Sequence, residues 1–233
     1  MAEPFDTNKA AISQGYDAIA GRLRMSPKFY RLCTRMLIPR LPPEAAVVDL
    51  GCGEGHLLAA FAASNPQLRF SGLDLSAKLC ELARQRVPGA TVIVGDLENL
   101  PFPPEMFDAA SMTEVLEHLL NPQLALKQVF NILKPGGWLL LTLPNRDWFR
   151  YARYQATHHR YQPVDDHWYS VAEARQMLTA DGFTVRQVRG AENLYFGGGL
   201  PHLLEKLALA VCPALQQRMK RALFLARKPL ADP

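Results

Sequence analysis

The sequence has few cysteines, and they are far apart. They stand at positions 33, 52, 80 and 212, and no two of them form a Cys-x-x-Cys pair. Structural zinc sites and disulfide frameworks depend on cysteines at close, regular spacing. Neither disulfide bonds nor a structural zinc ion are therefore expected, and the fold must be stabilised by a hydrophobic core.

Long apolar runs are absent as well. The longest run late in the chain, Leu207 to Leu215, is far shorter than the roughly 20 residues that span a bilayer. The first ten residues have neither the basic start nor the apolar centre of a secretory signal. The sequence thus predicts a cytoplasmic protein, with peripheral membrane contact left open.

A strong excess of one charge is also missing. The chain has 26 Lys and Arg against 22 Asp and Glu, a net charge of +4. This balance does not by itself indicate a nucleic-acid partner. Its 233 residues, 48% of them hydrophobic, suffice for one sizeable globular domain.

What the chain does have is a regular alternation of strand and helix patterns. Strands are expected at 47–50, 68–73, 91–94, 107–112, 138–143, 184–188 and 222–226, and helices at 8–20, 27–38, 56–64, 76–86, 122–133 and from the capping box Ser170–Glu173 to Gly182. Strands separated by helices form parallel βαβ units with helices on both faces. We therefore predict a single α/β domain over residues 45–233, with 1–44 as an N-terminal helical cap and lid insertions at 146–168 and 197–219.

A glycine-rich loop follows the first strand of this domain, where open α/β sheets bind their ligands. Gly51, Gly53 and Gly55 allow a close approach of the backbone to a ligand. Nicotinamide binding is one alternative, but its fingerprint needs a third glycine where this chain has His56. Asp49 also disfavours a pyrophosphate, and it suits a cationic ligand such as S-adenosylmethionine.

Acidic residues follow three successive strands. Asp74 ends the second strand at the position of a carboxylate that binds ribose hydroxyls, and Asp96 follows the third. Asp96 could accept a hydrogen bond from an adenine amino group, with Leu75 and Leu97 enclosing the base. Each acid alone could be an ordinary loop residue, but the three together indicate a nucleoside site.

Five motifs resemble those of class I S-adenosylmethionine-dependent methyltransferases. They are the segments 47–55, 73–76, 95–97, 114–118 and 133–137. The resemblance implies a three-layer α/β/α Rossmann-like domain, whose seven-stranded, mostly parallel sheet has an antiparallel last strand. It also implies a cofactor site built from Tyr16, Asp49, Gly51, Cys52, Gly53, Gly55, Asp74, Leu75, Gly95, Asp96, Leu97, Met112 and Thr113.

The segment after the fourth strand carries candidate catalytic groups. Glu114, Glu117 and His118 have the spacing that places three side chains on one face of a helical turn. The segment is similar to that of ubiquinone-pathway O-methyltransferases, and also to small-RNA 2′-O-methyltransferases. The latter resemblance implies a divalent cation (Mg²⁺, Mn²⁺ or Fe²⁺) held by Glu114, Glu117, His118 and His167. The alternative is a metal-free pocket in which His118 or His167 is the general base.

The segment from Arg146 to Tyr161 interleaves arginines with aromatic side chains. It could be a lid over a flat or lipid-like acceptor, a platform for single-stranded RNA, a membrane anchor, or a helix packed on its own domain. The apolar stripe in the second insertion could bury itself, line an acceptor pocket or form a dimer contact. The oligomeric state is left open.

Together these features predict methyl transfer to a small-molecule acceptor. The expected acceptor is a hydroxyl oxygen of an aromatic, glycosidic or prenylated metabolite. Three alternatives stay open at this point: an RNA or carbon methyltransferase, a nicotinamide-dependent oxidoreductase, and a catalytically silent cofactor-binding subunit.

Overall fold

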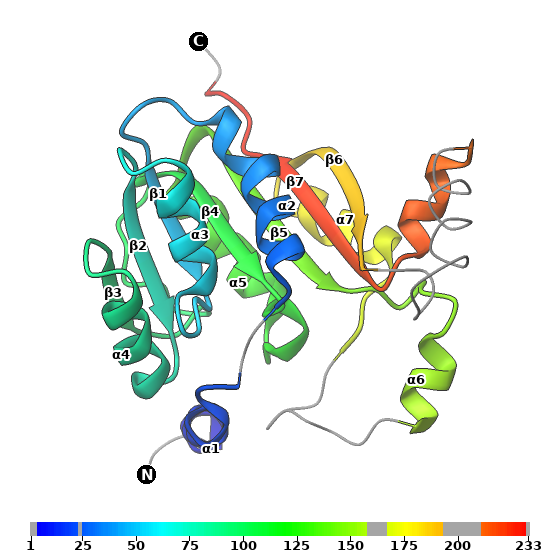
Figure 1. Cartoon of the computed structure of the whole chain (residues 1–233), viewed down its shortest axis with the longest axis horizontal. Helices are drawn as coiled ribbons and strands as arrows, with labels where there is room; N and C mark the ends of the chain where they lie inside the picture. The colour runs from blue at the N-terminus through cyan, green and yellow to red at the C-terminus, as the bar shows by residue number, and fades with distance from the viewer. Residues whose placement is uncertain (1–3, 23–24, 158–166, 193–210, 232–233) are drawn as a thin grey trace.

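The computed structural model of the chain describes residues 4–22, 25–157, 167–192 and 211–231. Within them, one sheet carries helices on both faces (Figure 1). The strands are β1 (Ala46–Leu50), β2 (Arg69–Asp74), β3 (Thr91–Val94), β4 (Phe107–Thr113), β5 (Leu133–Pro144), β6 (Thr184–Ala191) and β7 (Arg221–Arg227). The helices are α1 (Pro4–Ile19), α2 (Pro27–Leu37), α3 (His56–Ser64), α4 (Ala77–Arg86), α5 (Pro122–Ile132), α6 (Tyr151–Thr157) and α7 (Val171–Ala180), with 3₁₀ turns η1 (Ile38–Arg40), η2 (Leu116–His118) and η3 (Pro213–Arg218).

The sheet has seven strands in the order β3-β2-β1-β4-β5-β7-β6. β1 to β5 pair in parallel, whereas β7 runs antiparallel to both β5 and β6. This arrangement confirms the predicted mostly parallel sheet with an antiparallel last strand. The strand order reverses between β1 and β4, and a ligand crevice forms at the carboxyl ends of strands at such a reversal.

The core lies on both faces of the sheet. All five residues of β1 are buried, as expected for a central parallel strand with helices on each side. One cluster of apolar side chains packs α2, α3 and α4 against one face, and a second packs α5 and α7 against the other. The predicted three layers are therefore present.

Local capping chemistry explains where several helices begin. The Ser76 hydroxyl accepts a hydrogen bond from the Leu79 N–H at 3.0 Å, and Asn121 caps α5 ahead of its first-turn proline. The predicted capping box between Ser170 and Glu173 is present in full.

One strand boundary was predicted wrongly. β5 begins at Leu133, not at Trp138, because Leu133 already pairs with Phe107 of β4. The register then shifts before Trp138 pairs with Ala109, so the Lys-Pro-Gly-Gly segment lies inside an irregular strand.

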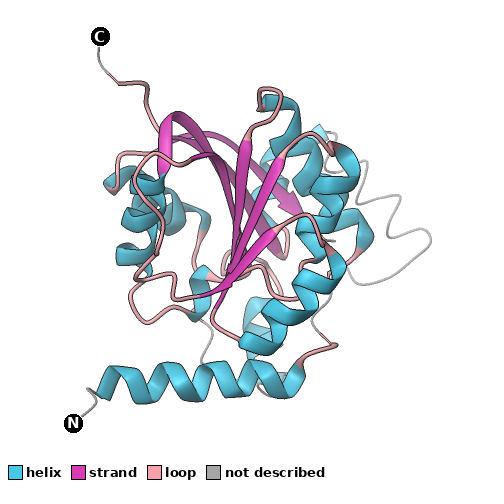
Figure 2. Cartoon of the chain, turned by 90° about the vertical axis from the view of Figure 1, so that its left-hand side faces the viewer, coloured by secondary structure: helices cyan, strands magenta, loops and turns pink. Residues whose placement is uncertain are grey.

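The two N-terminal helices occupy different places. α2 buries Phe29, Cys33, Met36 and Leu37 against the sheet and belongs to its helical layer. α1 instead lies across the end of the sheet where the parallel strands finish (Figure 2).

Two further observations bear on the sequence predictions. No helix in the described ranges is both long and apolar enough to cross a bilayer. The lid insertions predicted at 146–168 and 197–219 lie partly outside the described residues, as does Tyr161.

Candidate active site

A cavity of about 260 Å³ opens at the carboxyl ends of β1 to β4. Its wall includes most of the residues that the sequence singled out. They are Tyr16, Asp49, Gly51, Cys52, Gly53, Asp74, Leu75, Asp96, Leu97, Thr113, Glu114 and His118. The cavity therefore lies where the reversal of strand order places a ligand site.

Two positions of the glycine loop leave no room for a side chain. Gly51 has φ +70°, and a Cβ there would lie 2.4 Å from Val115 Cγ2. Gly55 has φ +76°, and its Cβ would lie 3.0 Å from the Ala83 Cα. Both positions therefore require glycine for conformation and for space.

Asp49 is a buried carboxyl group at the floor of the cavity. It is 1% exposed, and the Ser111 hydroxyl donates a hydrogen bond to its Oδ1 at 2.6 Å. Burial raises the pKa of this carboxyl group to about 7. Among the described residues no basic side chain forms an ion pair with Asp49. This environment fits a ligand that brings its own positive charge.

Asp74 is held in place by the backbone around it. Its carboxylate accepts hydrogen bonds from the N–H groups of Gly53, at 2.8 Å, and Ser76, at 2.9 Å. Burial raises its pKa, although these hydrogen bonds oppose the shift. Two oriented N–H donors fix the carboxylate while leaving lone pairs for ribose hydroxyls.

Asp96 lies at the far end of the cavity, between Leu97 and the N-terminal helix. Its carboxylate forms an ion pair with Lys9 of α1 and accepts a hydrogen bond from the Glu98 N–H at 2.9 Å. Leu75 and Leu97, which the sequence analysis expected to enclose an adenine, both line the same cavity.

The segment after β4 does not form the predicted helical turn. Glu114 has φ +57° and precedes the short turn η2, so it does not share a helical face with Glu117 and His118. Its carboxylate accepts hydrogen bonds from Thr142 Oγ1, at 3.0 Å, and from Arg221 Nε, at 2.7 Å. The prediction of one face was therefore wrong, because the chain turns at a left-handed residue.

His118 and His167 have different surroundings. His118 lines the cavity, with its ring centroid 6.2 Å from that of Tyr16 and its Nε2 3.7 Å from Glu117 Oε1. His167 has an exposed side chain that packs on Tyr169, with ring centroids 4.6 Å apart, and its N–H donates to the Glu117 carbonyl.

These positions do not assemble the predicted metal ligands. In the part of the chain that the structure describes, no three His, Cys, Asp or Glu side chains are grouped to hold a metal ion. Glu114 is engaged by Arg221, Glu117 is only 3% exposed, and His167 lies outside the cavity wall. The four-residue ligand set is therefore not supported.

Three other predicted residues support the site without lining it. Met112 is fully buried in the core, and Gly55 is the N-cap residue of α3. The Gly95 N–H donates to the Asp74 carbonyl at 2.9 Å, which ties the ends of β2 and β3 together.

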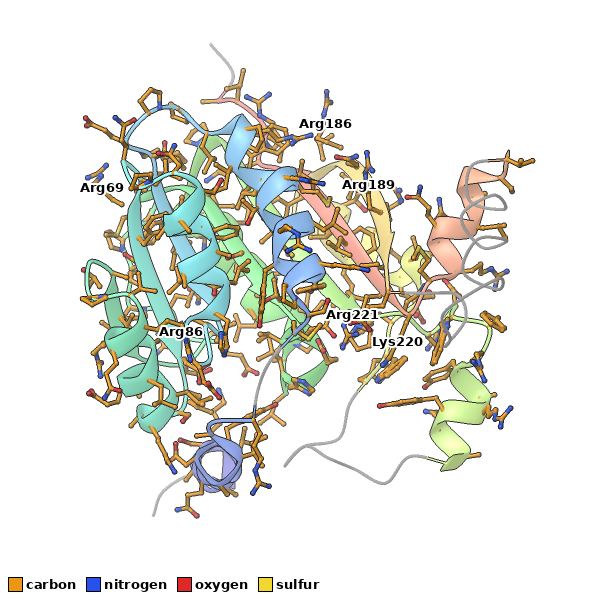
Figure 3. All side chains as sticks on the ribbon, in the orientation of Figure 1. Arg69, Arg86, Arg186, Arg189, Lys220 and Arg221 are labelled. Carbon is orange, nitrogen blue, oxygen red and sulfur yellow. The ribbon has the colours of Figure 1, made fainter. Side chains whose placement is uncertain are left out.

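Sequence reasoning missed Lys9 and Arg221, which also line the cavity. Arg221 stands at the start of β7 beside Lys220 (Figure 3), and Glu114 and Glu192 both pair with its guanidinium. Burial by itself would lower the pKa of Arg221. The negative charges of Glu114 and Glu192 outweigh the effect of burial, so the pKa of Arg221 is raised. An arginine directly before five apolar strand residues was the available signal.

The structure is a Rossmann-like α/β domain with a cavity at the carboxyl ends of its parallel strands. Residues 22–188 match the family described as "Methyltransferase domain". The match covers more than half of the chain, which therefore belongs to the class I S-adenosylmethionine-dependent methyltransferase family.

Known proteins agree with this placement. A protein of Mycolicibacterium smegmatis, described as a probable S-adenosylmethionine-dependent methyltransferase, is 29% identical over 74% of this chain and 63% of its own length. The tRNA (carboxymethyluridine(34)-5-O)-methyltransferase of Arabidopsis thaliana is 32% identical over 59% of this chain and 33% of its own length. The chain thus spans about one third to just under two thirds of these curated relatives.

A solved structure shows the same fold. The S-adenosylmethionine-dependent methyltransferase from Mesorhizobium loti has a TM-score of 0.60 and 23% identity, and the match covers 83% of this chain and 96% of that one. Family membership removes the support for a nicotinamide-dependent oxidoreductase.

Proposed function

We propose that the protein binds S-adenosylmethionine in this cavity and transfers its methyl group to a hydroxyl oxygen of a small-molecule acceptor. When bound, this cofactor supplies a methyl group activated by a positively charged sulfur. The observation that carries the proposal is Asp49, a buried carboxyl group that lines the cavity and has no basic partner among the described residues.

Each part of the cavity has a role in this proposal. Asp49 offers negative charge to the cationic end of the cofactor, and Asp74 accepts hydrogen bonds from the ribose hydroxyls. Leu75 and Leu97 enclose the adenine, with Asp96 near its amino group. Lys9, which already pairs with Asp96, closes this end of the cavity from α1.

His118 is the candidate general base for the acceptor hydroxyl. Its imidazole lies at the cavity wall beside the apolar side chains of Val115, Leu119 and Leu120. Glu117 stands 3.7 Å from it and can stabilise the imidazolium that forms on proton removal. Apolar surroundings of this kind suit an aromatic or prenylated acceptor better than a highly charged one.

The test is a methyl-transfer screen with isotopically labelled S-adenosylmethionine across phenols, sugars, quinols and RNA. With the acceptor so found, His118→Ala should lower kcat by about 10²- to 10⁴-fold while leaving affinity for S-adenosylhomocysteine nearly unchanged.

His167→Ala is the matched control, because His167 lies outside the cavity wall. It should leave kcat within a few-fold of the wild type. Equal losses in both variants, or transfer to RNA alone, would contradict the proposal.

A further inference from the structure

The modest net charge of the chain conceals a strongly uneven distribution. The segments 27–41, 55–68, 183–191 and 221–228 contain no Asp or Glu at all. They include α2, η1, α3, β6 and β7, and Figure 1 shows α2 in front of the sheet, between α3 and the strands β7 and β6. Six arginines in them form what we call the arginine face: Arg31, Arg35, Arg40, Arg186, Arg189 and Arg227.

The helical part of this face follows from the pattern of α2. Phe29, Cys33 and Met36 are buried beneath the helix, whereas Arg31 and Arg35 are exposed one turn apart on its outer side. A groove between α2 and α3, about 560 Å³ in volume, has both arginines in its wall and no acidic residue.

The strand part continues the same surface. Arg189 pairs across the sheet with Leu223, whose side chain packs in the α2-side core, so both lie on that face. Arg186 lies at an irregularity of β6, and both arginines project outward from that strand in Figure 3. Gln187 lies between the two parts of the face: in its favoured amide orientation its oxygen accepts from Arg189 Nε at 2.7 Å, and this orientation replaces the 3.4 Å hydrogen bond from Arg40 Nη2.

Trp138 holds two arginines of the face in position. The guanidinium carbon of Arg40 lies 5.8 Å from the ring centroid of Trp138, and that of Arg227 lies 5.2 Å from it. Cation–π contacts of this kind fix the direction of a guanidinium without neutralising its charge. Arg40 and Arg227 are thus held in place but still positively charged.

The six arginines are also not neutralised by the protein. Within the described ranges none of them forms an ion pair with a carboxylate, whereas Lys9, Lys134, Arg146 and Arg221 all do. Six positive charges exceed the net charge of +4 of the whole chain, so the remainder is net negative. Such a concentration of charge is the electrostatic footprint of a polyanion-binding surface.

We propose that the arginine face binds the phosphate backbone of RNA. Guanidinium groups bind phosphate oxygens through two parallel hydrogen bonds, so a surface of six arginines suits this ligand. Neither α2 nor β6 exposes a large apolar side chain that could insert into a lipid surface. The face therefore suits a nucleic acid better than a membrane.

Binding by this face should be independent of sequence and sensitive to salt. Two guanidinium groups already lie close to the Trp138 ring, so base stacking there is not expected. With six phosphate contacts to a single strand, log K should fall with log[KCl] at a slope of about −4. The inference goes beyond the proposed function, and it can fail while that function stands, because none of the six arginines lines the cofactor cavity.

The experiment is fluorescence anisotropy with a labelled, mixed-sequence 30-nucleotide RNA between 50 and 200 mM KCl. The double variant Arg35→Glu/Arg189→Glu should bind at least about tenfold more weakly at 100 mM KCl and show a shallower slope. The matched control is Lys127→Glu/Arg175→Glu, which makes the same change of charge at exposed positions of α5 and α7, on the other side of the sheet.

The control should bind RNA within about twofold of the wild type, because salt screens the repulsion between the RNA and the distant acidic groups that it adds. Calorimetry with S-adenosylhomocysteine should give the same affinity for all three proteins, which shows that the variants are folded. Three results would overturn the proposal: no RNA binding at 50 mM KCl, equal losses in both double variants, or binding to phosphatidylserine vesicles in place of RNA.

Discussion

At the residue scale, Asp49 is both buried and able to carry a negative charge, and burial disfavours that charge when no cationic ligand is bound. Its carboxyl group is buried, and burial raises its pKa to about 7, well above the ordinary value near 4. The folded protein therefore holds this proton more tightly than the unfolded chain does. Between about pH 4 and pH 7, ionisation of Asp49 must lower the free energy of unfolding as the pH rises.

Asp49→Asn should remove this loss. We expect the variant to have a higher melting temperature than the wild type at pH 8 and a smaller difference at pH 5, measured without cofactor. It should also bind S-adenosylmethionine more weakly at pH 8, because the cationic ligand loses its carboxylate. A variant with lower stability and unchanged affinity at pH 8 would show that Asp49 only supports the fold.

The sequence predicted the acids of the site better than the groups around His118. Asp49, Asp74 and Asp96 each follow a parallel strand, and the carboxyl ends of such strands meet at one edge. Glu114 was placed on a helical face by spacing alone, which could not reveal its left-handed backbone or its contact with Arg221. That contact joins residues 107 positions apart, and local patterns carry no information about it.

At the scale of elements, α1 is joined to the loops after β2 and β3 by three side chains at helical spacing. Lys9 pairs with Asp96, Ser13 Oγ donates to the Leu75 carbonyl at 3.1 Å, and Asp17 accepts from the Ser76 hydroxyl. Because these residues are four positions apart, they lie on one side of the helix. We propose that α1 covers the bound cofactor and slows its release.

Breaking two of these contacts should loosen the cover. Lys9→Ala/Asp17→Ala is expected to speed dissociation of S-adenosylhomocysteine several-fold, since each lost polar contact is worth about 0.5–1.5 kcal/mol. Stopped-flow displacement measures this rate. Gln14→Ala, an exposed position of the same helix, is the control and should leave the rate unchanged. A double variant with the wild-type rate would mean that α1 does not gate the cavity.

Most elements could be predicted because their start signals are local. Ser76, Asn121 and the Ser170–Glu173 box each begin a helix by satisfying N–H groups within the next turn. The start of β5 could not be predicted in this way. Its first residue, Leu133, is a strand residue only because Phe107 lies opposite.

At the scale of the whole molecule, the arginine face gathers positive charge from segments that are far apart in the sequence. The resemblance of five motifs sufficed to predict seven strands and the direction of the last one. The arginine face could not be predicted, because its members come from α2, η1, β6 and β7. Only the strand order β5-β7-β6 brings these distant segments together beside α2.

The cavity beside Asp49 is the centre of this account, and calorimetry tests it most directly. The account predicts that S-adenosylhomocysteine binds one site per chain and that NADH gives no binding heat. Asp74→Asn should weaken the first interaction by about tenfold or more, as expected for a lost hydrogen bond to a charged acceptor. Saturable binding of NADH together with no binding of S-adenosylhomocysteine would contradict it.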